Sequence, residues 1–295
     1  MRIKDTFTDR VFVAIAYAVV ILCVLIALYP LWLVVIYSIS DPQYVNTGSI
    51  WLLPKGISFE GYKEVLSKPA LLRGYWNTIT QTLVGTALNM VLTIPAAYAL
   101  SKKNLPGRGF FMTMILITMF FSGGLIPAFI NMKNLGLLNT WWAIPLSTGI
   151  STYNLIVART FFSSGVPHEL EEAAEIDGCS MAGVFFRIVL PLSKAMLGVI
   201  LLYYVVGHWN NYTSALYYTP TTTEYWPLQM VLRNIVQNLK LAEGIVDPVE
   251  MAEYAEMYNQ IKYSVIVVSS VPVLVLYPFL QKYFDKGVML GSVKG

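Results

Sequence analysis

Six long apolar stretches constrain the fold of this chain more than any other feature of its sequence. A helix needs about 20 predominantly apolar residues to cross the hydrocarbon core of a bilayer. Of all residues, 56% are hydrophobic and 13% are charged, whereas about a quarter are charged in soluble domains. The sequence therefore predicts an all-α membrane protein in a single domain, 1–295. Its six transmembrane helices are expected at 11–38, 77–100, 110–130, 141–162, 195–218 and 261–281.

Lys and Arg residues between the stretches predict the orientation, because cationic turns stay in the cytoplasm. The turn after the second stretch holds Lys102, Lys103 and Arg108, whereas the turn after the third holds only Lys133. We therefore expect a multi-pass protein of the cell membrane, in contact with lipid, with both termini cytoplasmic. The loop 163–194 is then cytoplasmic, and the longer loops 39–76 and 219–260 are external. The net charge of +3 is too small and scattered to indicate nucleic acid binding.

The cytoplasmic loop 163–194 is the most informative segment. Pro167 is suited to the start of a helix, and the acidic residues that follow it suit the positive end of the helix dipole. Gly178 can adopt the left-handed conformation that ends a helix. A second apolar series follows, and Pro191 is expected to close it. The pattern predicts two short amphipathic helices joined by a glycine turn, with small alanines that allow another protein to approach closely.

This loop resembles the EAA loop of binding-protein-dependent ABC importer permeases. The motif, with all of its spacings, comprises Glu172, Ala173, Ala174, Gly178, Ile188, Val189, Leu190 and Pro191. The likeness extends over nearly the whole chain. Residues 77–78, 105–108 and 287–295 resemble the carbohydrate branch related to the maltose importer. The runs 118–126 and 207–210 resemble its complex-oligosaccharide subgroup, to which the alginate-oligosaccharide importer belongs.

The resemblance implies the type I ABC importer permease fold and a heteromeric complex. Its partners would be a second, different permease, two cytoplasmic ATP-binding subunits and an external solute-binding protein. ATP and Mg would be bound by the ATPase subunits and no cofactor by this chain, which has no G-x-x-x-x-G-K-[ST] phosphate loop.

The resemblance also implies two sets of residues that contact the ATPases. Those of the EAA loop are Glu172, Ala173, Ala174, Asp177, Gly178, Ile188, Leu190 and Pro191. Those of the C-terminal tail are Gly291, Ser292, Val293, Lys294 and Gly295. A frayed, dispensable tail is the alternative for the second set.

Neutral polar and aromatic side chains gather in the fourth and fifth stretches. They predict a translocation pathway at Tyr153, Asn154, Trp209, Asn210, Asn211 and Tyr212. Interhelical hydrogen bonds are the alternative for these residues and for Gln81 and Asn89. His208 is expected to be a packed, hydrogen-bonding residue rather than a proton carrier. Sugars suit such a lining, because they present hydroxyls and apolar ring faces.

The expected cargo is an oligosaccharide, with acidic, alginate-type oligosaccharides included. A non-carbohydrate cargo, such as a peptide or a lipid-derived solute, is the alternative. A proton-coupled transporter would need carboxylates inside its spans, and none of the six stretches has one in its interior. His168 and Glu169 adjoin, but no histidine follows at the spacing of the H-E-x-x-H motif. We therefore expect a transporter subunit without catalytic residues or a metal site.

Overall fold

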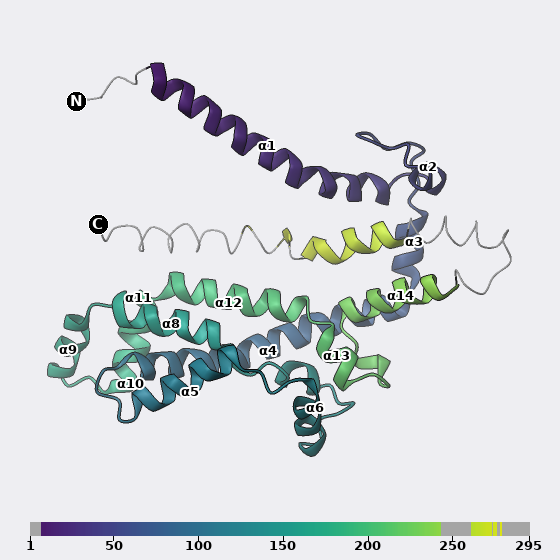
Figure 1. The fold of residues 1–295 in the computed structure, drawn as a ribbon. Helices are drawn as coiled ribbons and strands as arrows, with labels where there is room; N and C mark the ends of the chain where they lie inside the picture. Colours follow the sequence, from purple (N-terminus) through teal and green to yellow (C-terminus); the bar gives the residue numbers. More distant parts are fainter. Residues whose placement is uncertain (1–6, 243–260, 273, 276–277, 279–295) are drawn as a thin grey trace. The chain divides into compact units, whose positions relative to one another are not determined.

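The computed structural model describes residues 7–242, 261–272, 274–275 and 278. Within these residues the regular elements are helices and one isolated β-bridge, between Ser40 and Ile57 (Figure 1). This confirms the all-α fold class. Contacts between Cα atoms divide the chain into two compact units, one of residues 1–68 and 234–270 and the other of residues 69–233 and 271–295.

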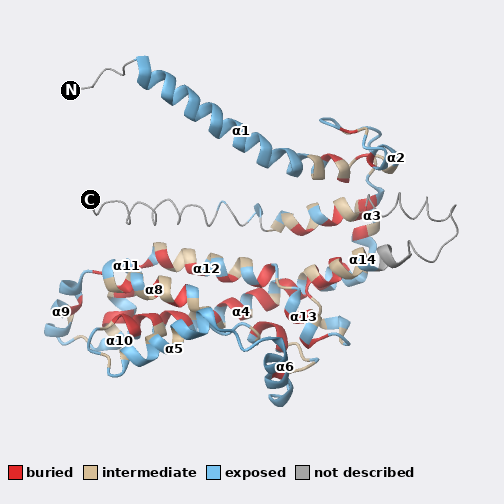
Figure 2. Ribbon diagram, viewed as in Figure 1, coloured by how far each residue is buried: buried red, intermediate tan, exposed pale blue. Residues whose placement is uncertain are grey.

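The first unit contains a long N-terminal helix whose surface is apolar on all sides. It comprises α1 (Phe7–Ser38), α2 (Pro42–Asn46), α3 (Glu60–Ser67) and most of the helix Ile261–Pro272. None of the most apolar 18-residue window of α1 is buried within the chain (Figure 2). Such a helix is suited to lipid or to another subunit. Only its last turns pack, where Ile36 joins Val45 and Ile50 in a small core.

The second unit is built around α4 (Pro69–Ser101), a helix of 33 residues. It packs most extensively against α8 (Thr152–Ser164) and α12 (Lys194–Trp209), and Figure 2 shows buried residues along much of its length. The main core lies between these three helices and the segment that precedes α12. Its largest members include Tyr98 from α4, Phe162 from α8, Phe185, and Tyr204 from α12.

Three of the predicted spans are broken helices rather than continuous ones. The third consists of α5 (Arg108–Phe120) and α6 (Leu125–Asn134), which are bent by 116° at a break where Gly124 has a φ of 86°. The fourth consists of α7 (Ala143–Leu146) and α8, and the fifth of α12 and α13 (Thr213–Tyr218). Non-helical backbone at membrane depth is tolerated where it is buried in protein or lines a cavity.

These breaks bear on the number of membrane crossings. Two described helices, Phe7–Ser38 and Pro69–Ser101, are continuous, long and apolar enough to cross a bilayer. The count rises to four if each of two bent helix pairs forms one span, namely α5 with α6, and Met181–Leu192 with Lys194–Trp209, which are bent by 82°. The predicted sixth span lies partly outside the described residues. Six spans therefore stay a prediction.

The predicted cytoplasmic loop folds into four short helical pieces. They are α9 (His168–Ile176), α10 (Met181–Val184), the π-helix η1 (Phe185–Val189) and α11 (Leu190–Leu192). Gly178 has a φ of 79°, which confirms the left-handed turn after the first helix. Pro191 does not close the second series, because the helix runs on to Leu192. Since proline has no N–H, it cannot complete an α-helical hydrogen bond, and the wider π-helix ends at Val189, two residues before it.

The remaining elements are a one-turn helix, η2 (Thr223–Tyr225), and α14 (Leu228–Ala242). Within the second unit, α9 to α11 lie at the end of α4 that carries Ser101, while α6 and α13 lie toward its other end (Figure 1). The predicted tail contacts at 291–295 lie outside the described residues.

Candidate functional site

The breaks in the fourth and fifth predicted spans face a cavity of about 730 Å³. One wall comes from residues 147–151 and the first turn of α8, and the other from the end of α12 and the residues that lead into α13. The lining consists of Ser147, Thr148, Gly149, Ile150, Ser151, Asn154, Tyr203, Tyr204, Gly207, His208, Asn210, Asn211, Thr213 and Ser214. The lining includes no Asp, Glu, Lys or Arg among the residues that the structure describes. This surface offers neutral hydrogen-bonding groups.

The structure brings three of the six predicted pathway residues to this cavity. These are Asn154, Asn210 and Asn211. The other three predicted pathway residues do not line the cavity. Tyr153 is exposed beside Tyr203, with ring centroids 6.2 Å apart, and Trp209 is buried. Tyr212 lies under the guanidinium of Arg233, at 5.5 Å from the ring centroid.

A buried pair of side chains on facing helices borders the cavity. His208 Nε2 on α12 lies 2.6 Å from Asn89 Oδ1 on α4. The Asn89 amide nitrogen donates to the backbone carbonyls of Thr148 and Gly149, in the break between α7 and α8. Gly85, one turn earlier on α4, has no room for a side chain, because a Cβ there would overlap the His208 ring. The packed, hydrogen-bonding interpretation of His208 agrees with this geometry.

Gln81 and Asn89 make interhelical hydrogen bonds rather than lining the cavity. Gln81 Nε2 donates to the backbone carbonyl of Tyr225 at 2.8 Å, and Asn89 bonds the α7–α8 break. Thr93 adds a third polar contact on α4, with its hydroxyl 2.6 Å from that of Tyr204. The contacts of Gln81 and Asn89 therefore agree with the alternative left open by the sequence, in which these amides hold segments of the chain together, although the Gln81 Oε1 atom is buried without a hydrogen-bond partner among the residues that the structure describes.

The second candidate site is the surface of α9. Among the predicted ATPase contacts, Glu172 and Ala173 on α9 and Asp177 and Gly178 just after it are exposed, while Ala174 is partly covered by the main core. In the second series, Ile188 and Leu190 are partly buried and Pro191 is exposed. Exposed apolar side chains surround these positions, and Ile176 is 86% exposed. The chain thus leaves most of the motif free for a partner.

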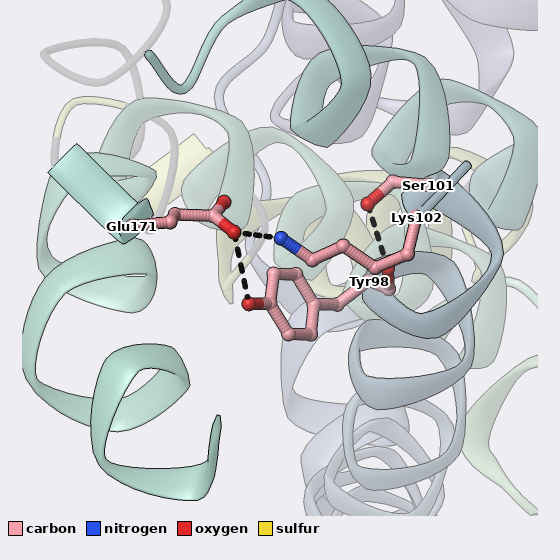
Figure 3. A network of polar contacts seen from close by, with 4 residues as sticks. All are labelled: Tyr98, Ser101, Lys102 and Glu171. Atoms are coloured by element: carbon pink, nitrogen blue, oxygen red, sulfur yellow. Dashed lines mark hydrogen bonds and ion pairs between the residues drawn. The ribbon is translucent and has the colours of Figure 1, made fainter. Parts of the chain in front are cut away.

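An ion pair that the sequence analysis missed ties α9 to the end of α4. The Glu171 carboxylate pairs with the Lys102 ammonium and accepts a hydrogen bond from the Tyr98 hydroxyl at 3.4 Å (Figure 3). Glu171 is only 5% exposed, although its neighbour Glu172 faces solvent. Burial lowers the pKa of the Lys102 ammonium, and the Glu175 carboxylate counteracts this shift. The sequence does show a basic turn near Lys102 and an acidic helix near Glu171. It does not show which of these charged residues form a pair.

These features together define a class of protein. Broken helices around a neutral cavity, a long unburied apolar helix and an exposed motif on a short helix indicate a membrane transport subunit rather than an enzyme. Residues 70–290 match the family described as binding-protein-dependent transport system inner membrane component, and the chain belongs to this family. It is therefore an inner-membrane subunit of an importer that works with a binding protein.

Curated relatives cover nearly the whole chain. The chain is 41% identical to Protein LplC of Bacillus subtilis over 92% of its own length and 90% of that protein. It is 40% identical to the polygalacturonan/rhamnogalacturonan transport system permease protein YtcP of the same organism, over 97% and 99% of the two chains. These relationships confirm the predicted likeness to carbohydrate permeases and the prediction of a transporter subunit that is not an enzyme.

A solved structure shares the fold. It is described as a bacterial ABC transporter involved in the import of the acidic polysaccharide alginate. The match has a TM-score of 0.83 at 32% identity and covers 95% of this chain and 99% of that one. The type I permease fold that the motif predicted is confirmed by this similarity and by the family match.

Proposed function

We propose that this chain and a second, different permease form the membrane pathway of an ABC importer for oligosaccharides. The observation that carries this proposal is the neutral cavity of about 730 Å³ beside the broken helices. Its amide, hydroxyl and phenol groups match the many hydroxyls of a sugar, which needs hydrogen-bond partners when it leaves water. The similarity to YtcP and to a transporter involved in alginate import supports a carbohydrate cargo.

The proposal includes acidic oligosaccharides, with their countercharge supplied from outside this chain. The cavity lining has no Lys or Arg among the described residues, so a carboxylate would find no cationic partner on this wall. The second permease or the solute-binding protein would provide it. The similarity to a transporter of the acidic polysaccharide alginate favours this version over a peptide or a lipid-derived cargo.

We further infer that α9 is the segment on which the ATPases act. Two ATP-binding subunits would hold ATP and Mg, and one of them would receive the exposed side of α9 in a cleft. Ala173 and Gly178 present small surfaces there, and Ile176 adds an exposed apolar side chain. An unpaired apolar side chain outside the membrane suits a protein interface. The tail 291–295 is proposed as a second ATPase contact on the family resemblance alone.

The orientation follows the same proposal. Both termini, the α4–α5 turn and α9 are placed in the cytoplasm, and the segments around α6 and α13 face outward, where a solute-binding protein would deliver the sugar. The cluster of Lys102, Lys103 and Arg108 supports this assignment, because basic turns are retained inside.

Reconstitution tests the cargo. The complete complex is placed in proteoliposomes with its cognate binding protein, and ATP hydrolysis is measured with neutral oligosaccharides, uronate oligosaccharides or peptides. We expect sugars of at least one class to stimulate hydrolysis and to accumulate inside. Stimulation by peptides alone would refute the carbohydrate assignment. Asn210→Leu is expected to reduce sugar uptake, because it removes a hydrogen-bonding amide from the cavity lining.

A further inference from the structure

A row of small and polar residues runs along the buried side of α4. Every fourth residue from Asn77 to Ser101 belongs to it, and all seven are buried: Asn77, Gln81, Gly85, Asn89, Thr93, Ala97 and Ser101. Four residues turn an α-helix by about 400°, so the row advances by about 40° around the helix at each step. The row therefore meets different parts of the chain in succession.

At the outer end of α4 the row holds the segment around η2. Asn77 Nδ2 donates to the backbone carbonyls of Glu224 at 2.7 Å and Trp226 at 3.0 Å. Gln81 bonds the carbonyl between them, that of Tyr225. Three consecutive backbone carbonyls of this segment are therefore fastened to one helix.

In its middle the row holds both walls of the cavity. Asn89 bonds the α7–α8 break and His208 of α12, as described for the cavity. Thr93 bonds the Tyr204 hydroxyl, which in turn accepts the backbone N–H of Ser151 at 3.1 Å. Since His208, Tyr204 and Ser151 all line the cavity, a shift of α4 would displace its lining on both sides.

At its inner end α4 is joined to α9. Tyr98 and Lys102, on the last turn of α4 and just beyond it, both contact the buried carboxylate of Glu171 (Figure 3). Ser101 Oγ donates to the Tyr98 backbone carbonyl at 2.6 Å and closes this last turn. The side chains of α9 are mostly exposed, so this pair is a localised attachment beside the packing of α9 against α10 and η1.

Stability alone does not account for such a pair. Glu171 is buried and Lys102 is partly buried, so the desolvation cost of the pair offsets much of its Coulomb energy. A charge-assisted pair with one buried partner does fix geometry, because that partner has few alternative positions. Close-packed helices then move together rather than compress.

We propose that the Lys102–Glu171 pair is the positioning contact through which a displacement of α9 moves α4, and with it both walls of the cavity. The inference rests on the proposed role of α9 as the segment on which the ATPases act. A second connection also leaves α9, because α9 packs against α10 and η1, which lead through α11 into α12. The ion pair supplies a charge-assisted connection from α9 itself to α4. Without it, ATPase movement would reach α4 only indirectly, through η1, whose Phe185 ring packs against Tyr98, and through α12, which packs along α4.

The test measures coupling in the reconstituted complex with its cognate binding protein. Glu171→Gln and Lys102→Met each remove one charge, and the double variant Lys102→Glu with Glu171→Lys restores a pair with reversed signs. Lys103→Met is the matched control, because Lys103 is exposed and forms no ion pair with any residue that the structure describes. The measured quantity is sugar transported per ATP hydrolysed, with assembly checked by co-purification of all subunits.

We expect both single variants to assemble and hydrolyse ATP, with the transport ratio lowered about fivefold or more, the lower limit of typical coupling between sites. The charge-reversed pair should recover most of this loss, and Lys103→Met should match the unmodified chain. An unchanged ratio in both single variants would overturn the proposal. So would a loss that charge reversal leaves uncorrected.

A thermal-unfolding measurement separates this role from a structural one. If Glu171→Gln lowers the melting temperature and the transport ratio together, and charge reversal restores only the melting temperature, the pair is structural and the proposal fails. Failure of the underlying function is seen separately, in the unmodified complex, as ATP hydrolysis that no sugar stimulates.

Discussion

Asn89 on α4 and His208 on α12 are 119 residues apart in sequence, yet the Asn89 side-chain carbonyl oxygen lies 2.6 Å from His208 Nε2. The same Asn89 side chain holds the carbonyls of Thr148 and Gly149, where α7 gives way to α8. One amide therefore satisfies polar groups on both sides of the cavity. This concentration of partners makes Asn89 a structural residue, in contrast with Asn210 on the cavity surface.

Asn89→Leu is expected to destabilise the protein by about 1–3 kcal/mol, because it leaves the buried His208 imidazole and two backbone carbonyls at the α7–α8 break without their partner. Thermal unfolding of the purified complex in detergent measures the change. Asn210→Leu is the control, since Asn210 is exposed and its amide bonds the Val206 carbonyl of its own helix at 3.0 Å. The control should reduce sugar uptake with little effect on the melting temperature. Equal loss of stability in both variants would contradict this division of roles.

Gly85→Ala is expected to destabilise the fold by about 1–3 kcal/mol, because the added methyl group overlaps the His208 ring. Gly109→Ala makes the same chemical change in α5, where a Cβ meets nothing within 4 Å. That variant should be neutral or slightly more stable. Melting temperatures of the two purified complexes give the comparison. If they agree, His208 moves aside at little cost and its packing against Gly85 is not restrictive.

Ala173→Glu is expected to weaken binding of the ATPase subunits while the chain itself folds and inserts. Ala173 is exposed in this chain, so the new carboxylate meets a steric and electrostatic obstacle only in a partner's cleft. Burying an unpaired charge costs a few kcal/mol, and each ~1.4 kcal/mol lowers an affinity tenfold. Quantitative co-purification of the ATPases measures the loss. Asn104→Glu adds the same charge to the exposed α4–α5 turn and should retain them. Full retention by Ala173→Glu would remove α9 from the interface.

Single cysteines test the orientation. In a background without Cys23 and Cys179, Asn134→Cys at the end of α6 and Asn104→Cys in the α4–α5 turn should react from opposite sides of the membrane. Both positions are exposed. A membrane-impermeant maleimide applied to sealed right-side-out vesicles should label Asn134→Cys at once and Asn104→Cys only after permeabilisation. Labelling of both before permeabilisation would refute the assigned topology.

Local chemistry explains which predictions from the sequence succeeded. The apolar stretches α1 and α4 follow from composition, because backbone groups in lipid must be satisfied within a helix. The left-handed turn at Gly178 follows from the residue type, because glycine carries no Cβ to oppose a positive φ. The spacing of the EAA motif likewise identified the family, because a motif consists only of residue types at fixed separations in the sequence.

Other features depend on contacts between distant residues. The bend of 116° after α5 occurs at a glycine pair visible in the sequence, but its angle depends on what each half packs against. Asn154 reached the cavity while Tyr153 did not, because neighbouring residues on a helix point about 100° apart. Asn210 and Asn211 reached it from the non-helical break between α12 and α13. Their direction is set by how α8 and α12 pack on α4.

The adjacent residues Glu171 and Glu172 also show the difference between what the sequence predicts and what the packing decides. In the sequence they are two adjacent residues of the same type in an acidic segment, and only Glu172 belongs to the EAA motif. The sequence by itself determined that one membrane protein would carry a basic turn near Lys102 and an acidic helix near Glu171. Only the tertiary structure decided that Glu171 turns inward to Lys102 while Glu172 stays in solvent, because that choice depends on the rotation of α9 against the end of α4.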